Sequence, residues 1–208
     1  MRVLLIGATG LTGRLALEEL KSAGHEVSAF VRAGKERSLP ASASLNIAIG
    51  DGRDAASLAA AAKGQDAVLS TFGPASLRTG DLQETYMRNL IAAMTDAGVK
   101  RLVNLSAAGV GATASQMPFL FRSVLIPLLF KEAFVDKARG EKLLFSSPLD
   151  YVNVMPGRLT NGPARGGVKA QAAAAGLKLS MARADLAKFL AGQLISDQWV
   201  RIPVFIGY

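Results

Sequence analysis

Three glycines near the start of the chain have the spacing of a nucleotide-binding turn. Gly7, Gly10 and Gly13 form a G-x-x-G-x-x-G motif between a short apolar run (2–6) and a helical pattern (14–23). Gly7 permits a tight turn, Gly10 lets the backbone approach a pyrophosphate, and Gly13 lets the helix pack closely. Unpaired amides at the helix start then face the negative charge. The motif predicts a dinucleotide site, with an ordinary strand-to-helix turn as the alternative. No Gly-Lys-Ser/Thr follows that would indicate an ATP phosphate loop.

Basic residues follow the second predicted strand, over 26–31. Arg32 stands about where NAD-binding proteins place an acidic residue for the ribose 2′-hydroxyl. An arginine there suits a 2′-phosphate instead, and Lys35 and Arg37 can add to the same site. These residues predict NADP(H) as the cofactor. A solvated basic loop is the alternative.

Two further loops follow predicted strands over 45–49 and 66–71. Asp51 stands at the carboxyl end of the first of these, where ligands gather in parallel sheets. It either bonds the adenine amino group or serves as a turn or helix N-cap residue. Gly73, just after the second strand, lets the backbone press against the cofactor's ribose.

The elements that position these residues alternate between strand and helix. This alternation predicts an α/β fold, a Rossmann-like doubly wound parallel sheet with right-handed crossovers and strand order 3-2-1-4-5. We expect a single NAD(P)-binding domain over residues 1–208. Further helices and strands are predicted at 53–63, 81–97, 101–106, 132–145, 150–155, 184–195 (a helix capped by Ser180) and 199–206.

Two segments are predicted to lie on the substrate side, 107–131 and 156–180. The first begins as a loop and becomes strongly apolar, interrupted by prolines. Its residues 113–131 wall the substrate pocket, contact a partner protein or a second copy of the chain, or belong to the core. Within the second segment, residues 165–179 are predicted to have weak structure.

Composition limits the function classes. The chain has 208 residues, of which 50% are hydrophobic and 19% charged, as in globular proteins. The absence of cysteine excludes disulfides and thiolate catalysis, and with His25 as the single histidine no metal site is expected. The net charge of +8 is spread along the chain, which favours anionic small molecules over nucleic acid. Apolar runs are too short for a signal peptide or a membrane span, so a soluble cytoplasmic protein is expected.

The ordered set of motifs resembles the atypical short-chain dehydrogenase/reductase group of NAD(P)H-binding proteins. This group includes the flavin reductase/biliverdin IXβ reductase type and the NmrA-like regulators. The blocks that carry the resemblance are Gly7–Gly13, Val31-Arg32, Gly50-Asp51, 99–106, 149–160 and 180–187.

The resemblance implies a position for each part of NADP(H). It places the cofactor on the glycine loop, Arg32 at the 2′-phosphate and Asp51 near the adenine. Ser106 is implied beside the nicotinamide. The other implied contacts are Phe72 and Gly73 along the ribose, Pro156 and Gly157 of segment 156–160 at the carboxamide, and the loop residues Gly7, Thr9, Gly10, Leu11, Thr12 and Gly13.

Two departures from the group's pattern bear on the chemistry. Met155 precedes Pro-Gly where the group often has arginine, and Ala133 stands four residues before Lys137, where a Tyr-x-x-x-Lys motif has its tyrosine. Without this proton donor, oxidoreduction of alcohols or sugar nucleotides is disfavoured. Hydride transfer to a flavin or quinone remains, because a conjugated ring accepts hydride and solvent can supply the proton.

Two residues are candidates for this chemistry. Ser106 is expected to bond the carboxamide or the acceptor, and Lys137 the nicotinamide ribose; a strand-end cap and a solvated helix face are the respective alternatives. We expect an NADPH-dependent reductase of a small planar acceptor. The competing hypothesis is a non-catalytic NADP(H)-binding sensor that contacts a partner through residues 113–131.

Overall fold

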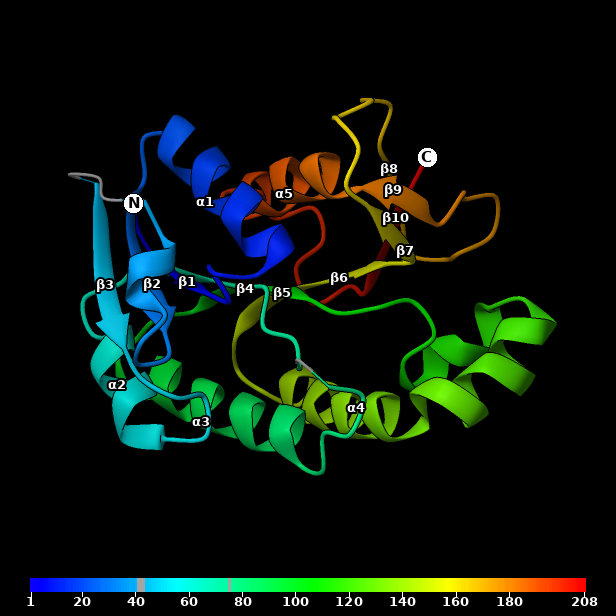
Figure 1. The fold of residues 1–208 in the computed structure, drawn as a ribbon, viewed down its shortest axis with the longest axis horizontal. Coiled ribbons are helices and arrows are strands. Elements are labelled where there is room, and N and C mark those ends of the chain that lie inside the picture. Colours follow the sequence, from blue (N-terminus) through cyan, green and yellow to red (C-terminus); the bar gives the residue numbers. More distant parts are fainter. Residues whose placement is uncertain (41–43, 75) are drawn as a thin grey trace.

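A computed structural model describes residues 1–40, 44–74 and 76–208 (Figure 1). Its main sheet has the strand order β3-β2-β1-β4-β5-β6-β10-β8. All neighbouring strands in it are parallel except β8, which pairs antiparallel with β10. The strands are β1 (Arg2–Ile6), β2 (Glu26–Val31), β3 (Leu45–Ile49), β4 (Ala67–Ser70), β5 (Arg101–Leu105), β6 (Asp150–Pro156), β8 (Lys169–Gln171) and β10 (Val204–Gly207).

Helices cover both faces of this sheet, as Figure 1 shows. One layer holds α1 (Leu11–Ser22) and α5 (Arg183–Gly192). The opposite layer holds α2 (Ala55–Ala62), α3 (Leu82–Asp96) and α4 (Lys131–Phe145). This arrangement and the order 3-2-1-4-5 confirm the predicted doubly wound fold.

The core has two apolar layers because successive strand residues point to opposite faces of the sheet. Val3 and Leu5 of β1 pack with the α1 and α5 side chains. Leu4 and Ile6 of the same strand pack with those of α2 and α3. The strands in the middle of the sheet are therefore largely apolar on both faces, with Asn104 of β5 and Asn153 of β6 as buried polar exceptions.

Some local predictions were wrong. The stretch 107–131, predicted to begin as a loop, contains a 3₁₀ helix over Gly111–Gln116 and a π-helical segment over Phe121–Phe130. Ser180 does not cap α5, because it lies in a short strand, β9 (Ser180–Ala182), that pairs with β7 (Arg158–Thr160). The N-cap of α5 is Ala182. The final strand begins at Val204, since residues 199–202 form turns.

The remaining boundaries differ by small shifts. α1 begins at Leu11, directly after the second glycine of the motif, three residues before the predicted start. A third short helix, at Glu36–Ser38, lies within the predicted basic loop after β2 and contains Arg37. Among the described helices, none is long and apolar enough to cross a bilayer.

Candidate cofactor and acceptor site

The glycine turn between β1 and α1 has a packing requirement for two of its glycines. Gly7 has φ +84°, a conformation that other residues rarely adopt. A Cβ on Gly13 would overlap the carbonyl oxygen of Gly7. A Cβ on Gly10 would meet that oxygen at 3.3 Å and no other atom within 4 Å apart from its chain neighbours. Gly7 and Gly13 therefore serve the turn itself, whereas Gly10 leaves an open backbone surface.

The start of α1 is free to bind an anion. No described side chain caps this helix, and its first turn carries no acidic residue. In the described chain, the backbone amides of Leu11, Thr12 and Gly13 have no hydrogen-bond partner. The side chain of Leu11 is 62% exposed beside them. Free amides at the positive end of a helix dipole are the donors that a pyrophosphate requires.

Arg32 leaves the sheet at the same edge as the glycine turn. Ile6 at the end of β1 pairs with Phe30 near the end of β2, so the two following loops are neighbours. Arg32 and Arg37 are exposed, and neither forms an ion pair with a described residue. The guanidinium groups of Arg32, beside the turn, and of Arg37, farther along the same loop, are thus both unpaired within the described chain.

Asp51 is a turn residue. Its Oδ1 accepts a hydrogen bond from the amide of Arg53 at 2.8 Å. The N-cap of α2 is Asp54, whose carboxylate accepts from the amide of Ala56 at 3.0 Å. The turn alternative for Asp51 is therefore confirmed and the N-cap alternative is wrong. Its carboxylate is exposed, and its contact with adenine stays a prediction.

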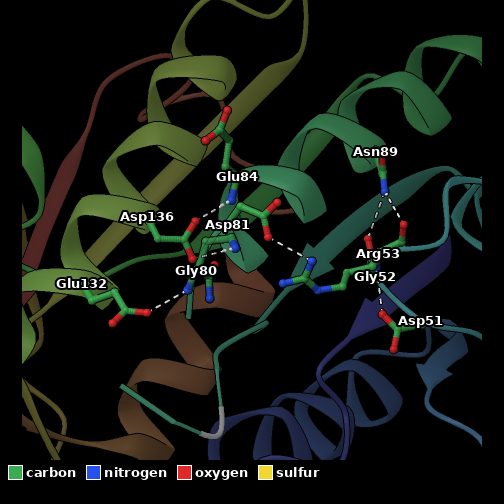
Figure 2. Close-up of polar contacts among 10 residues, drawn as sticks. Asp51, Gly52, Arg53, Gly80, Asp81, Glu84, Asn89, Glu132 and Asp136 are labelled. Carbon is green, nitrogen blue, oxygen red and sulfur yellow. Dashed lines mark hydrogen bonds and ion pairs between the residues drawn. The ribbon is translucent and has the colours of Figure 1, made fainter. Parts of the chain in front are cut away.

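The loop after β3 is tied to α3, as Figure 2 shows. The guanidinium of Arg53 pairs with Asp81 at 2.9 Å. The amide of Asn89 donates to the carbonyls of Gly52 and Arg53 at 3.3 and 3.0 Å. These bonds fix the backbone around Asp51 at the sheet edge.

Phe72 and Gly73 follow β4 at this edge. The Phe72 ring stacks on Tyr86 of α3, with ring centroids 4.0 Å apart and planes inclined by 20°. Gly73 is exposed, and a Cβ there would meet no described atom within 4 Å. The Phe72 ring is thus held by protein, whereas Gly73 offers open backbone for a ligand, and their positions along the ribose stay a prediction.

Carboxylates of α4 hold the segment that leads from this edge into α3 (Figure 2). Asp136, which is buried, accepts from the amides of Gln83 at 2.9 Å and Glu84 at 3.1 Å. Glu132 accepts from the amide of Gly80 at 2.9 Å. Because α3 has no cap of its own side chains, Asp136 performs that function from a neighbouring helix. This contact was not predicted from the sequence.

Replacing Asp136 with alanine should therefore destabilise the fold. The change removes two charge-assisted hydrogen bonds and leaves amides of α3 unpaired in the interior, a loss of about 3 kcal/mol in the free energy of unfolding. For a chain of this size the melting temperature should fall by about 6–12 °C. The matched control is Glu132→Ala, which removes one exposed bond and should cost under about 1 kcal/mol. Urea and thermal unfolding measure both variants. An equal loss of stability in Asp136→Ala and Glu132→Ala would contradict the capping role of Asp136.

Ser106 and Lys137 come together at the end of β5. The Ser106 amide donates to the Val154 carbonyl at 2.8 Å, while its Oγ is buried and has no hydrogen-bond partner in the described residues. Lys137 Nζ donates to the Leu105 carbonyl at 3.4 Å. Burial lowers the pKa of the Lys137 ammonium, and the nearby Glu141 and Asp136 partly oppose this. Lys137 is therefore not on a solvated helix face, and the Ser106 hydroxyl is not a strand-end cap.

One alanine and two asparagines near this pair matter for the chemistry. Ala133, one turn before Lys137, is buried and offers no proton donor. Asn104 and Asn153, paired in register on β5 and β6, are joined by a 2.7 Å hydrogen bond. Asn153 in turn donates to Glu141 of α4 at 2.8 Å. Sequence analysis missed this buried chain; its one signal was a polar residue within each of two otherwise apolar strands.

Pro156 and Gly157 end β6 at the same edge. The Pro156 carbonyl accepts from the amide of Ala108 at 2.8 Å. A Cβ on Gly157 would overlap the carbonyl of Leu179, so this glycine permits two backbone segments to approach each other. Gly157 thus has a packing role, and the contact of this segment with the carboxamide stays a prediction.

The site residues fit a nicotinamide dinucleotide. Free amides at α1, unpaired arginines after β2 and the unpartnered Ser106 hydroxyl all lie along the carboxyl ends of the parallel strands. That edge is where doubly wound folds bind dinucleotides.

Known proteins resemble this chain in sequence and in fold. The uncharacterized sugar epimerase YhfK of Bacillus subtilis (strain 168) is 31% identical over 178 residues, 82% of this chain and 78% of YhfK. The anaerobillin reductase ChuY of Escherichia coli O157:H7 matches with TM-score 0.80 and 22% identity over all of this chain and 97% of ChuY. A short-chain dehydrogenase/reductase of Veillonella parvula DSM 2008, solved in complex with NADP, matches with TM-score 0.82 and 17% identity over 100% and 94% of the two chains.

The family assignment rests on a match over most of the sequence. A family profile described as NAD(P)H-binding covers residues 7–197, from the first glycine of the turn to beyond α5. The matched residues include the glycine motif and the strands whose ends form the site. The chain therefore belongs to the NAD(P)H-binding family, and its sheet has the doubly wound Rossmann-like order.

Proposed function

We propose that the protein is an NADPH-dependent reductase that transfers hydride to a planar conjugated acceptor of the flavin or quinone type. The observation that carries this proposal is the composition of the nicotinamide end. It has an unpartnered hydroxyl at Ser106 and an ammonium at Lys137, but Ala133 where a tyrosine would protonate an alkoxide. ChuY, which shares the fold, is described as a reductase, and this supports the same general activity.

The chain's own residues bind and orient the cofactor, which supplies the hydride when bound. The free amides at the start of α1 bind the pyrophosphate, and Arg32, assisted by Arg37, binds the 2′-phosphate. Asp51 contacts the adenine, and the backbone at Gly73 lies along a ribose. Ser106 and Lys137 hold the nicotinamide half, so that the ring faces the acceptor.

The segments 107–131 and 156–180 form the acceptor side of a single domain. The first carries exposed apolar side chains that suit a flat, poorly hydrated ring. These are Phe119, Leu120, Leu128 and Leu129. The second segment includes the β7 strand, which directly follows Pro156 and Gly157.

A second candidate is a non-catalytic NADP(H)-binding sensor that contacts a partner protein or another copy of the chain through residues 113–131. The exposed apolar side chains of this segment and the alanine at position 133 favour it. A sugar epimerase, the activity in the name of YhfK, has weaker support, because oxidising a sugar hydroxyl requires a base and Ala133 supplies none.

The test is NADPH oxidation assayed with a panel of flavins and quinones, with a nucleotide sugar added as a separate arm. We expect turnover with at least one conjugated acceptor and none with the sugar. NADPH binding without turnover above background for any acceptor would contradict the reductase proposal and favour the non-catalytic sensor.

A further inference from the structure

A buried carboxyl group lies behind the proposed nicotinamide end. Glu141, on α4 one turn after Lys137, is 5% exposed. Its Oε1 accepts from Asn153, which is held in turn by Asn104. Two asparagines on adjacent strands thus fix the orientation of one acidic side chain in the protein interior. An ionised carboxyl group in such a position is costly unless it is paired or hydrogen-bonded, and burial favours its protonated form.

Ser106, which directly follows β5, lies near this carboxyl. The Ser106 hydroxyl lowers the pKa of the Glu141 carboxyl, so the two side chains are near each other, and the hydroxyl is buried without a hydrogen-bond partner of acceptable geometry among the described residues. The backbone of Ser106 is fixed to Val154 at 2.8 Å. A fixed residue with a free hydroxyl can donate to a ligand on one side and accept from a carboxyl on the other.

We propose that Glu141 supplies the proton of the reduction through Ser106, in place of the tyrosine that Ala133 lacks. This proposal rests on the proposed reductase function. Glu141 touches neither cofactor nor acceptor; it acts through Ser106 and so positions and replenishes the proton that Ser106 delivers.

The C4–H bond of NADPH breaks, and its hydride reduces a ring atom of the acceptor while NADPH is oxidised to NADP⁺. The acceptor heteroatom that gains negative charge takes the proton of Ser106 Oγ, and that oxygen takes the proton of the Glu141 carboxyl. Glu141 then regains a proton from solvent. The sum is NADPH plus acceptor plus one proton giving NADP⁺ and the two-electron-reduced acceptor.

The surroundings of Glu141 favour its protonated form. Burial raises the pKa of its carboxyl, opposed by Ser106 of the β5 end, Asn153 of β6 and Lys137 of its own helix. Lys137 is the one charged group among these, and the two do not form an ion pair within 4.0 Å in the described residues. No titratable side chain of α3 contributes to this shift. The carboxyl thus retains a proton at pH values where an exposed glutamate has lost it.

The experiment compares wild type with Glu141→Gln, using an acceptor from the flavin and quinone panel. The amide preserves the shape and the acceptor atom for Asn153 but cannot deliver a proton in this way. We expect kcat to fall about 100-fold, within the range for positioned proton transfer, with the KM for NADPH unchanged. The wild-type kcat should decline as pH rises through the pKa of Glu141, and this alkaline decline should be absent from the variant.

The matched control is Asp136→Asn, a second buried carboxyl on α4. It should lower the melting temperature, because Asp136 caps α3, and should keep the alkaline decline of kcat. Ser106→Ala tests the same route if Glu141→Gln does not fold. This variant should also lose the alkaline decline of kcat. The double variant should be no slower than the slower single one, since both act in one path.

The outcomes separate the two proposals. A wild-type enzyme that turns over, with an unchanged alkaline decline in Glu141→Gln or Ser106→Ala, overturns the proton route and leaves the reductase proposal standing. A wild type that turns over no acceptor overturns both. Loss of kcat with the decline retained would show that Glu141 acts only on structure, which also overturns the route.

Discussion

Replacing Gly13 with alanine is expected to remove measurable NADPH binding and to lower the free energy of unfolding by about 3 kcal/mol. The added Cβ would overlap the Gly7 carbonyl and lie 2.8 Å from Thr71 Oγ1. Backbone cannot yield as a flexible side chain does, so α1 must move away from β1, at the upper end of the cost of overpacking. Because the amides of α1 are the expected pyrophosphate donors, that movement should also displace the site. Urea unfolding and a fluorescence titration with NADPH measure the two effects.

Gly10→Ala is the matched control for this result. Its Cβ would lie 3.3 Å from the same carbonyl, a contact that small adjustments relieve. The unfolding free energy should therefore change by under about 1 kcal/mol. NADPH should still bind at least about tenfold more weakly, because the new methyl group projects where the pyrophosphate approaches. A Gly13→Ala variant with wild-type stability would contradict the packing role of that glycine.

Replacing Arg32 with alanine is expected to weaken NADPH binding by about 10–150-fold and to leave NADH binding unchanged. An arginine pairs with a phosphate through charge-assisted hydrogen bonds that contribute about 1.5–3 kcal/mol, which gives this range. Arg32 has no ion pair within the described chain, so its loss leaves no buried charge unpaired and the fold should be unaffected. Titrating both cofactors into both proteins measures the selectivity directly.

Two further variants sharpen that result. Arg32→Lys keeps the charge but not the planar fork, and should recover only part of the affinity for NADPH. Arg37→Ala should cost less than Arg32→Ala, because Arg37 lies farther along the loop, in the short helix at Glu36–Ser38. An equal loss of NADH and NADPH affinity in Arg32→Ala would refute a 2′-phosphate contact.

The periodic parts of the sequence predicted the fold well. The apolar runs at 2–6, 26–31 and 45–49 became β1, β2 and β3 with their predicted bounds. β1 is buried on both faces and is apolar for that reason, whereas β3 is an edge strand whose residues remain partly or fully exposed. The glycine spacing predicted the turn because Gly7 and Gly13 meet in space within a seven-residue stretch. Such local constraints are visible in one chain segment and need no tertiary information.

The missed features depend on contacts between distant segments. Asp136 caps α3 from another helix, and nothing in the pattern around residue 81 indicates where that cap comes from. In the sequence, Glu141 has the pattern of an exposed polar residue of an amphipathic helix. Its burial results from packing against β6, where Asn153 donates to it, and this contact cannot be predicted from the helix alone. The β7–β9 pair joins three-residue strands more than 15 residues apart, too short for a recognisable alternation.

The position of β10 has a consequence for the order in which the molecule assembles. β10 lies between β6 and β8, although both precede it in the chain. β8 has only three residues and no other neighbour in the main sheet, so it cannot pair until β10 has docked. Pairings of high sequence separation form slowly. We therefore expect β1 to β5 to become protected from hydrogen exchange before residues 169–171. The strands that carry the proposed cofactor site would then fold before the sheet edge at β8, which lies within the proposed acceptor segment 156–180.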